Sequence, residues 1–114
     1  MTSIPLSERF GPYCMSSAQG ATLYHDLRSS LGRNEAVELD FTGVSILIAS
    51  FLNASLAKMY GEFSQEEIVA LVSFRGLSPA HAEVVQAVVD NAKSFFYNET
   101  YRKAQDEAIK KMFE

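Results

Sequence analysis

The spacing of the apolar residues changes along this chain, and that change limits the fold more than any other feature of the sequence. Val37, Leu39 and Phe41 alternate with polar residues, a pattern typical of a half-buried strand. Apolar residues spaced by three or four positions precede and follow this strand and predict helices over 18–31 and 50–62. Helices and strands that alternate over such short connections indicate an α/β fold with parallel strands.

The stretch 67–74 carries two conflicting signals. Ser64 and Glu67 have the spacing of a capping box, which favours a helix. The stretch is also short, rich in valine and bounded by Gly76 and Pro79, which favours a strand. We interpret it as a buried strand.

The last helix of the domain has the clearest start in the chain, because Ser78 suits an N-cap and Pro79 suits the first helical position. A wide apolar face follows, and the chain then closes with a charged segment. We assign residues 1–97 to one domain and residues 98–114 to a charged helical extension of it. The apolar side of that extension carries Ile109, Met112 and Phe113.

These elements predict a small open α/β sandwich, with a mostly parallel sheet of three to five strands and three to four helices. The N-terminal segments 3–6 and 13–15 add one or two short strands. Parallel sheets are usually covered on both faces and their strands are then continuously apolar. Because the central strand carries Glu38 and Asp40, we expect its sheet to be covered fully on one face only.

Composition excludes several classes of partner and location. The chain has 114 residues and a net charge of −4, so it lacks the positive charge with which proteins neutralise phosphate, and we expect neither nucleic acid nor an anionic membrane as a partner. The charge-free stretch 42–57 is too short and too polar to span a bilayer. A single cysteine and an N-terminus without a secretory pattern predict a cytoplasmic protein.

The sequence offers few residues for catalysis. Cys14, His25 and His81 are the available nucleophile and bases, but no local signature accompanies them. The histidines and the cysteine lack the spacing of a zinc site, and the glycines form no phosphate-binding motif. We interpret Gly20 as a loop glycine that admits the chain to the first helix. We therefore expect no enzymatic activity, no metal and no cofactor.

The passage from strand to helix over 37–52 is the most distinctive part of the chain. In one interpretation Gly43 forms the turn, and Ser45 or Ser50 caps the following helix. In the other, Ser50 is exposed at the carboxyl end of a parallel strand, a position at which open α/β sheets bind ligands and partners.

This passage resembles the STAS domain, named for sulfate transporters and anti-sigma-factor antagonists, and more closely a bacterial family of STAS-like domains of unknown function. The resemblance is carried by Asp40-Phe41-Thr42-Gly43-Val44 at the strand end and Ser50-Phe51 at the helix start. It extends to Gly20 and covers residues 4–97. It implies a regulatory binding module and not a catalyst.

The resemblance also implies a kind of partner. Antagonists of this fold bind a histidine-kinase-like (GHKL-type) ATPase, which phosphorylates a serine before the second helix and so breaks the complex. In this chain the acceptor position of that motif is Ala49, and only its neighbour Ser50 keeps a hydroxyl. Ser50 is therefore the candidate phosphorylation site, and a charge there is expected to weaken binding.

We expect a partner protein to bind through the loop and helix at 45–58. The residues expected to contact it are Ser45, Ser50, Phe51, Asn53 and Lys58, with Ser55 on the same exposed side. Two other hypotheses stay open. One is a small ligand or nucleotide bound by helix N-termini at the strand ends, and the other is a homo-oligomer formed through the apolar side of the C-terminal extension.

Overall fold

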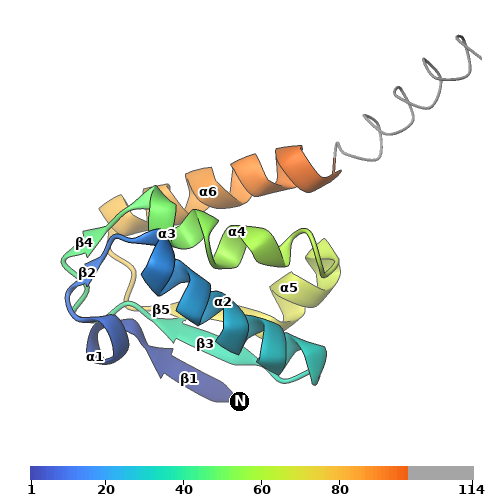
Figure 1. The fold of residues 1–114 in the computed structure, drawn as a ribbon, viewed down its shortest axis with the longest axis horizontal. Helices are drawn as coiled ribbons and strands as arrows, with labels where there is room; N and C mark the ends of the chain where they lie inside the picture. Colours follow the sequence, from blue (N-terminus) through green and yellow to red (C-terminus); the bar gives the residue numbers. More distant parts are fainter. Residues whose placement is uncertain (98–114) are drawn as a thin grey trace, which may run out of the picture.

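Short strands and helices alternate along the part of the chain described by the computed structural model, residues 1–97 (Figure 1). The strands are β1 (Thr2–Pro5), β2 (Tyr13–Cys14), β3 (Val37–Asp40), β4 (Ile46–Leu47) and β5 (Val72–Arg75). The helices are α1 (Leu6–Phe10), α2 (Ser17–Gly32), α3 (Ala49–Asn53), α4 (Leu56–Met59), α5 (Gln65–Leu71) and α6 (Pro79–Tyr97). The predicted C-terminal extension, and the oligomer contact proposed on it, lie outside the described residues.

The main sheet has three parallel strands in the order β1-β3-β5. Figure 1 shows α2, α4 and α6 on one side of this sheet. Val37 and Leu39 are buried on that side, whereas Glu38 and Asp40 are only partly buried. The predicted α/β class, the parallel strands and the single fully covered face are confirmed.

The second predicted helix is in fact two short helices, α3 and α4, separated at Ala54 and Ser55. The Ser55 hydroxyl is buried and donates a hydrogen bond of 2.8 Å to the carbonyl oxygen of Phe51. A serine bonded in this way to the preceding turn competes with regular helix geometry. Because this helix is divided, and because α1 and α5 were not expected, three to four helices was too low a number.

The first half of the stretch 67–74 is helical, so the prediction of a strand there was wrong. Ser64 and Glu67 form the capping box: the backbone N–H of Glu67 donates to the Ser64 hydroxyl at 3.2 Å, and the Glu67 carboxylate accepts from the Ser64 N–H at 3.4 Å. The helix ends at Leu71 and β5 follows directly, so the strand begins five residues later than predicted. It is also not the buried strand that we expected, because only Val72 of its residues is buried.

The interpretation of Gly20 as a loop residue was also wrong. The N-cap of α2 is Ser16, and Gly20 lies inside the helix, buried against α3. A Cβ atom at Gly20 would lie 2.4 Å from the carbonyl oxygen of Phe51 and 2.6 Å from the Cβ of Ala54. The missing side chain therefore lets α2 and α3 approach closely.

Candidate functional site

The turn after β3 contains the motif that carries the resemblance, and its residues join the ends of the strands. Asp40 accepts a hydrogen bond of 2.9 Å from the backbone N–H of Thr42. The hydroxyl of Ser7, which follows β1, donates to the carbonyl oxygen of Thr42 at 2.8 Å. Gly43 has a φ of 86°, which favours glycine, so the prediction that it forms the turn is confirmed. The motif thus has a structural role in the described part of the chain.

The carboxylate of Asp40 makes this turn sensitive to acid. Hydrogen bonds from the hydroxyl and the backbone N–H of Thr42 hold the pKa of Asp40 below its ordinary value of 3.8. A carboxylate with a lowered folded-state pKa stabilises the fold above its unfolded pKa, and this contribution is lost as the pH falls through the folded value. We expect the free energy of unfolding of the wild type to exceed that of Asp40→Asn near neutral pH, and this difference to shrink below about pH 4. Chemical denaturation at several pH values measures it, and a difference that does not change with pH would contradict the assignment.

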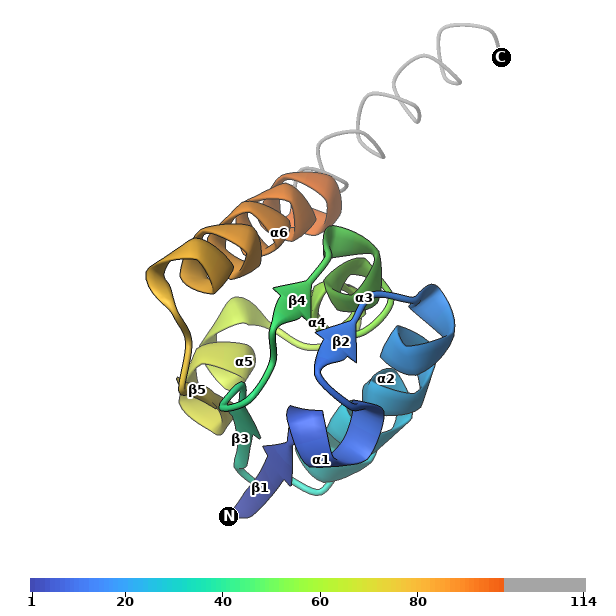
Figure 2. The same cartoon turned by 90° about the vertical axis from the view of Figure 1, so that its left-hand side faces the viewer.

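A second, smaller parallel sheet pairs β2 with β4 at one end of the molecule, which Figure 2 views directly. Cys14 and Leu47 point into the core, whereas Tyr13 and Ile46 lie opposite each other and point outward. Met15 and Ile48 continue the same alternation on the outer side. These outer side chains are large and well exposed: Tyr13 53%, Met15 43%, Ile46 41% and Ile48 41%.

No charged residue interrupts the two segments that build this end. The sequence has no aspartate, glutamate, lysine or arginine between Arg9 and Asp26, or between Asp40 and Lys58. Protein interfaces are depleted of charge at their centres and enriched in tyrosine and methionine. We therefore take this surface as the candidate site and call its members the uncharged patch. They are Tyr13, Met15, Ile46 and Ile48.

Among the residues expected to contact a partner, Ser45 and Ser50 are exposed and flank β4. The expectation that Phe51 is exposed was wrong, because it is fully buried and its ring packs edge-to-face on that of Phe10, with 5.5 Å between centroids. Ser55 is also fully buried. The helix begins one residue earlier than expected and its N-cap is Ile48, without a capping side chain, so neither serine caps it.

The two remaining expected contacts, Asn53 and Lys58, are exposed but point toward other surfaces. Asn53 lines a groove of about 290 Å³ between α3, α4 and α6. The Nζ of Lys58 lies 5.4 Å from the ring centroid of Tyr24 on α2. The structure therefore does not bring all the expected contacts together.

A family model described as a STAS-like domain of unknown function (DUF4325) matches residues 19–82, which is more than half of the chain. The chain belongs to this family. No curated protein and no solved structure matches it. The predicted membership and fold are confirmed. The matched region of this STAS-like domain includes Ile46 and Ile48, whereas Tyr13 and Met15 lie before it.

The uncharged patch of this STAS-like domain was missed in the sequence, although two signals for it were present. Tyr13 and Met15 alternate with a buried residue, as do Ile46 and Ile48. Each pair also lies inside one of the charge-free segments. Neither signal shows that the two segments pair with each other.

The candidate nucleophile and bases lie in unlike surroundings. Cys14 is fully buried, and burial raises the pKa of its thiol, which disfavours the reactive thiolate. His25 is exposed on α2. His81 lies in the first turn of α6, where its backbone N–H donates a hydrogen bond to the hydroxyl of the N-cap residue Ser78. Within residues 1–97 no three histidine, cysteine, aspartate or glutamate side chains gather as metal ligands. The helices described are all too short or too polar to cross a bilayer.

The longer helices use their own side chains to satisfy their N-termini. The hydroxyl of Ser16 accepts from the backbone N–H of Gln19 at 3.1 Å, and Ser64 and Ser78 accept equivalent bonds on α5 and α6. Fewer N–H groups are then left for an anion. This reduces the support for a small ligand bound at helix N-termini.

Proposed function

We propose that this STAS-like domain is a non-catalytic, cytoplasmic interaction module that binds a partner protein through the uncharged patch. One observation carries the proposal: four large apolar side chains, on or directly after the paired strands β2 and β4, are exposed together on two segments that contain no aspartate, glutamate, lysine or arginine. Removing apolar surface from water contributes about 25 cal/mol per Å², from which the entropy costs of association are subtracted. The two segments carry no aspartate, glutamate, lysine or arginine, whose desolvation would oppose binding.

The backbone beneath the patch supports a preformed binding surface. The N–H groups of Ser45 and Ile46 both donate to the carbonyl oxygen of Pro12, at 2.8 and 3.1 Å, and Ile48 donates to Cys14 at 3.0 Å. The inward side chains of both strands are buried. A surface held in this way loses little conformational entropy on binding.

The resemblance to anti-sigma-factor antagonists supports a GHKL-type ATPase as the partner. The acceptor position of that family's motif is Ala49 in this chain, so we propose its neighbour Ser50, which keeps a hydroxyl, as the site of regulation. Ser50 is exposed and lies two residues beyond Ile48 of the patch. A phosphate would add a charge of about −2 to a segment without charged residues, and its desolvation would oppose binding.

Replacing Ile46 with lysine is expected to weaken partner binding about tenfold or more, because the ammonium group must be desolvated at the centre of the interface. Val69→Lys is the matched control, since Val69 is 69% exposed on α5, outside the patch. Affinity capture from native lysate identifies proteins retained by the wild type and by Val69→Lys but lost with Ile46→Lys. The affinity of each is then measured by titration. If Ile46→Lys retains every specific partner at wild-type affinity, the patch is not the interface.

The same titration tests the role of Ser50. We expect Ser50→Asp to weaken binding and Ser50→Ala to leave it close to the wild type, since only the first adds a charge. Equal affinities for the two variants would separate Ser50 from the interface.

A further inference from the structure

The outer edge of β1 is a second unpartnered part of the described chain, away from the uncharged patch. β1 pairs with β3 on one side only. The N–H of Thr2 donates to Ala36 at 2.9 Å and so faces β3. Successive residues of a strand direct their backbone groups to opposite sides, so the N–H and the carbonyl of Ser3 face outward. Pro5 faces the same side, where the missing N–H of proline is tolerated.

This edge opens into a recess of about 490 Å³ between β1, α1 and α2. In Figure 1, α2 lies on the helical side of the sheet, above β3 and β1, and α1 follows the carboxyl end of β1. Arg9 of α1 forms an ion pair with Asp26 of α2 at that end of the recess. Glu8 also lines the recess, so its α1 end has an excess of negative charge.

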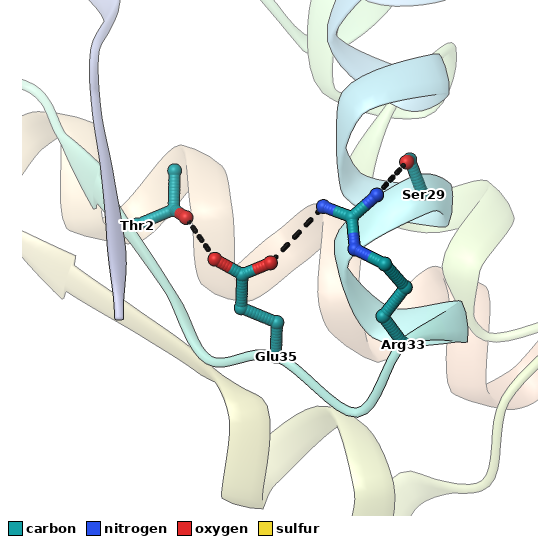
Figure 3. Close-up of polar contacts among 4 residues, drawn as sticks. All are labelled: Thr2, Ser29, Arg33 and Glu35. Carbon is teal, nitrogen blue, oxygen red and sulfur yellow. Dashed lines mark hydrogen bonds and ion pairs between the residues drawn. The ribbon is translucent and has the colours of Figure 1, made fainter.

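Arg33 lies at the opposite end of the recess, beside the start of β1, and its side chain is held in place. Figure 3 shows its guanidinium between Ser29, whose hydroxyl accepts at 2.7 Å, and Glu35, whose carboxylate accepts at 3.0 Å. Glu35 in turn accepts a hydrogen bond from the hydroxyl of Thr2. Since a guanidinium has five N–H donors, Arg33 retains donors for a further acceptor. Its side chain is 63% exposed.

We propose that this recess binds an extended peptide antiparallel to β1, with the free C-terminal carboxylate of the peptide beside Arg33. The outward N–H and carbonyl of Ser3 would pair with the peptide backbone, as in other additions of a strand to a sheet edge. An antiparallel peptide reaches the end of its partner strand at Thr2, which places its terminus next to Arg33. Near α1 the recess has an excess of negative charge, from Glu8 and Asp26 against Arg9, whereas at the other end Glu35 only balances Arg33. A peptide carboxylate therefore meets less repulsion beside Arg33, which favours this direction. The inference is independent of the proposed function, because it uses none of the residues of the uncharged patch.

The probe is an N-acetylated tetrapeptide, Val-Thr-Ser-Val, with a free carboxylate, titrated into the ¹⁵N-labelled full chain and followed by NMR. We expect saturable shifts centred on the amides of residues 2–4 and of Arg33. The same peptide with a C-terminal amide should bind about tenfold more weakly, because it loses charge-assisted hydrogen bonds. A third peptide, amidated and ending in aspartate, tests whether a side-chain carboxylate serves equally.

Three variants sharpen this test. Arg33→Gln should weaken binding of the free-carboxylate peptide about tenfold, and Glu35→Gln should strengthen it by removing a competing carboxylate. Lys58→Gln, which removes a cation outside the recess, should leave the affinity unchanged. Because Arg33 is exposed, we expect its replacement to leave the fold intact. Equal unfolding temperatures of the wild type and each variant verify this. Four outcomes would each overturn the proposal. They are the absence of saturable shifts, equal affinities for the carboxylate and amide peptides, binding of the aspartate peptide as tight as that of the free-carboxylate peptide, and shifts centred on the uncharged patch.

Discussion

Phe51→Ala is expected to lower the free energy of unfolding by about 3–5 kcal/mol, a large part of the 5–15 kcal/mol that is typical of a domain. The side chain of Phe51 is fully buried, so its removal leaves a cavity. The variant also loses the edge-to-face contact with Phe10, an arrangement worth about 0.5–1.5 kcal/mol beyond the area it buries. Urea denaturation of the wild type and the variant measures the difference.

This experiment also separates two roles for Phe51. A residue that contacts a partner would lower the affinity of the complex when truncated and leave the unfolding curve unchanged. Phe74→Ala is a suitable control, because Phe74 is an aromatic residue that is 40% exposed on β5 and should cost less. An unchanged unfolding curve for Phe51→Ala would contradict the buried position.

Gly20→Ala is expected to destabilise the domain by about 1–3 kcal/mol through overpacking. Helix propensity alone predicts the opposite sign, since alanine is favoured over glycine by about 1 kcal/mol within a helix. The new methyl group would meet the backbone carbonyl of Phe51. Backbone atoms cannot move aside as the end of a flexible side chain could. Chemical denaturation gives the sign directly.

Gly32→Ala provides the matched control for this variant. Gly32 is the last residue of α2, and a Cβ atom there would meet nothing within 4 Å. We expect it to be neutral or stabilising by up to about 1 kcal/mol. If Gly20→Ala is as stable as Gly32→Ala, α2 and α3 are not in close contact.

Elements with strong local signals were predicted well. The strand 37–40 follows from strict alternation, and α6 begins at Pro79 after a capping serine. The division between α3 and α4 was missed because Ser55 was expected on the exposed side of one continuous helix, whereas its buried hydroxyl bonds to the carbonyl oxygen of Phe51. At 67–74 the capping box was the decisive local signal, and the valine content was given too much weight.

The segment that we expected to bind a partner adjoins the uncharged patch, but the two sets of residues differ. The loop and helix start that we expected do adjoin an exposed surface, with Ser45 and Ser50 beside it. The helix begins at Ala49, one residue early; Phe51 is buried beside Leu52, and Ile48 stays outside. Tyr13 and Met15 come from a distant segment, and only the pairing of β2 with β4 places them beside Ile46. Because that pairing is a contact between segments far apart in the sequence, local sequence patterns do not predict it.

Site-directed cross-linking tests most directly whether the uncharged patch binds a partner. Ser50→Cys offers one accessible thiol, since the native Cys14 is fully buried, and it can be labelled with a photoreactive benzophenone maleimide. Val69→Cys carries the same label at a comparison position on α5. After irradiation of the complex with the captured partner, we expect a covalent adduct from position 50 and none from position 69. Adduct formation from position 69 alone, or from neither position while the complex is intact, would contradict the account.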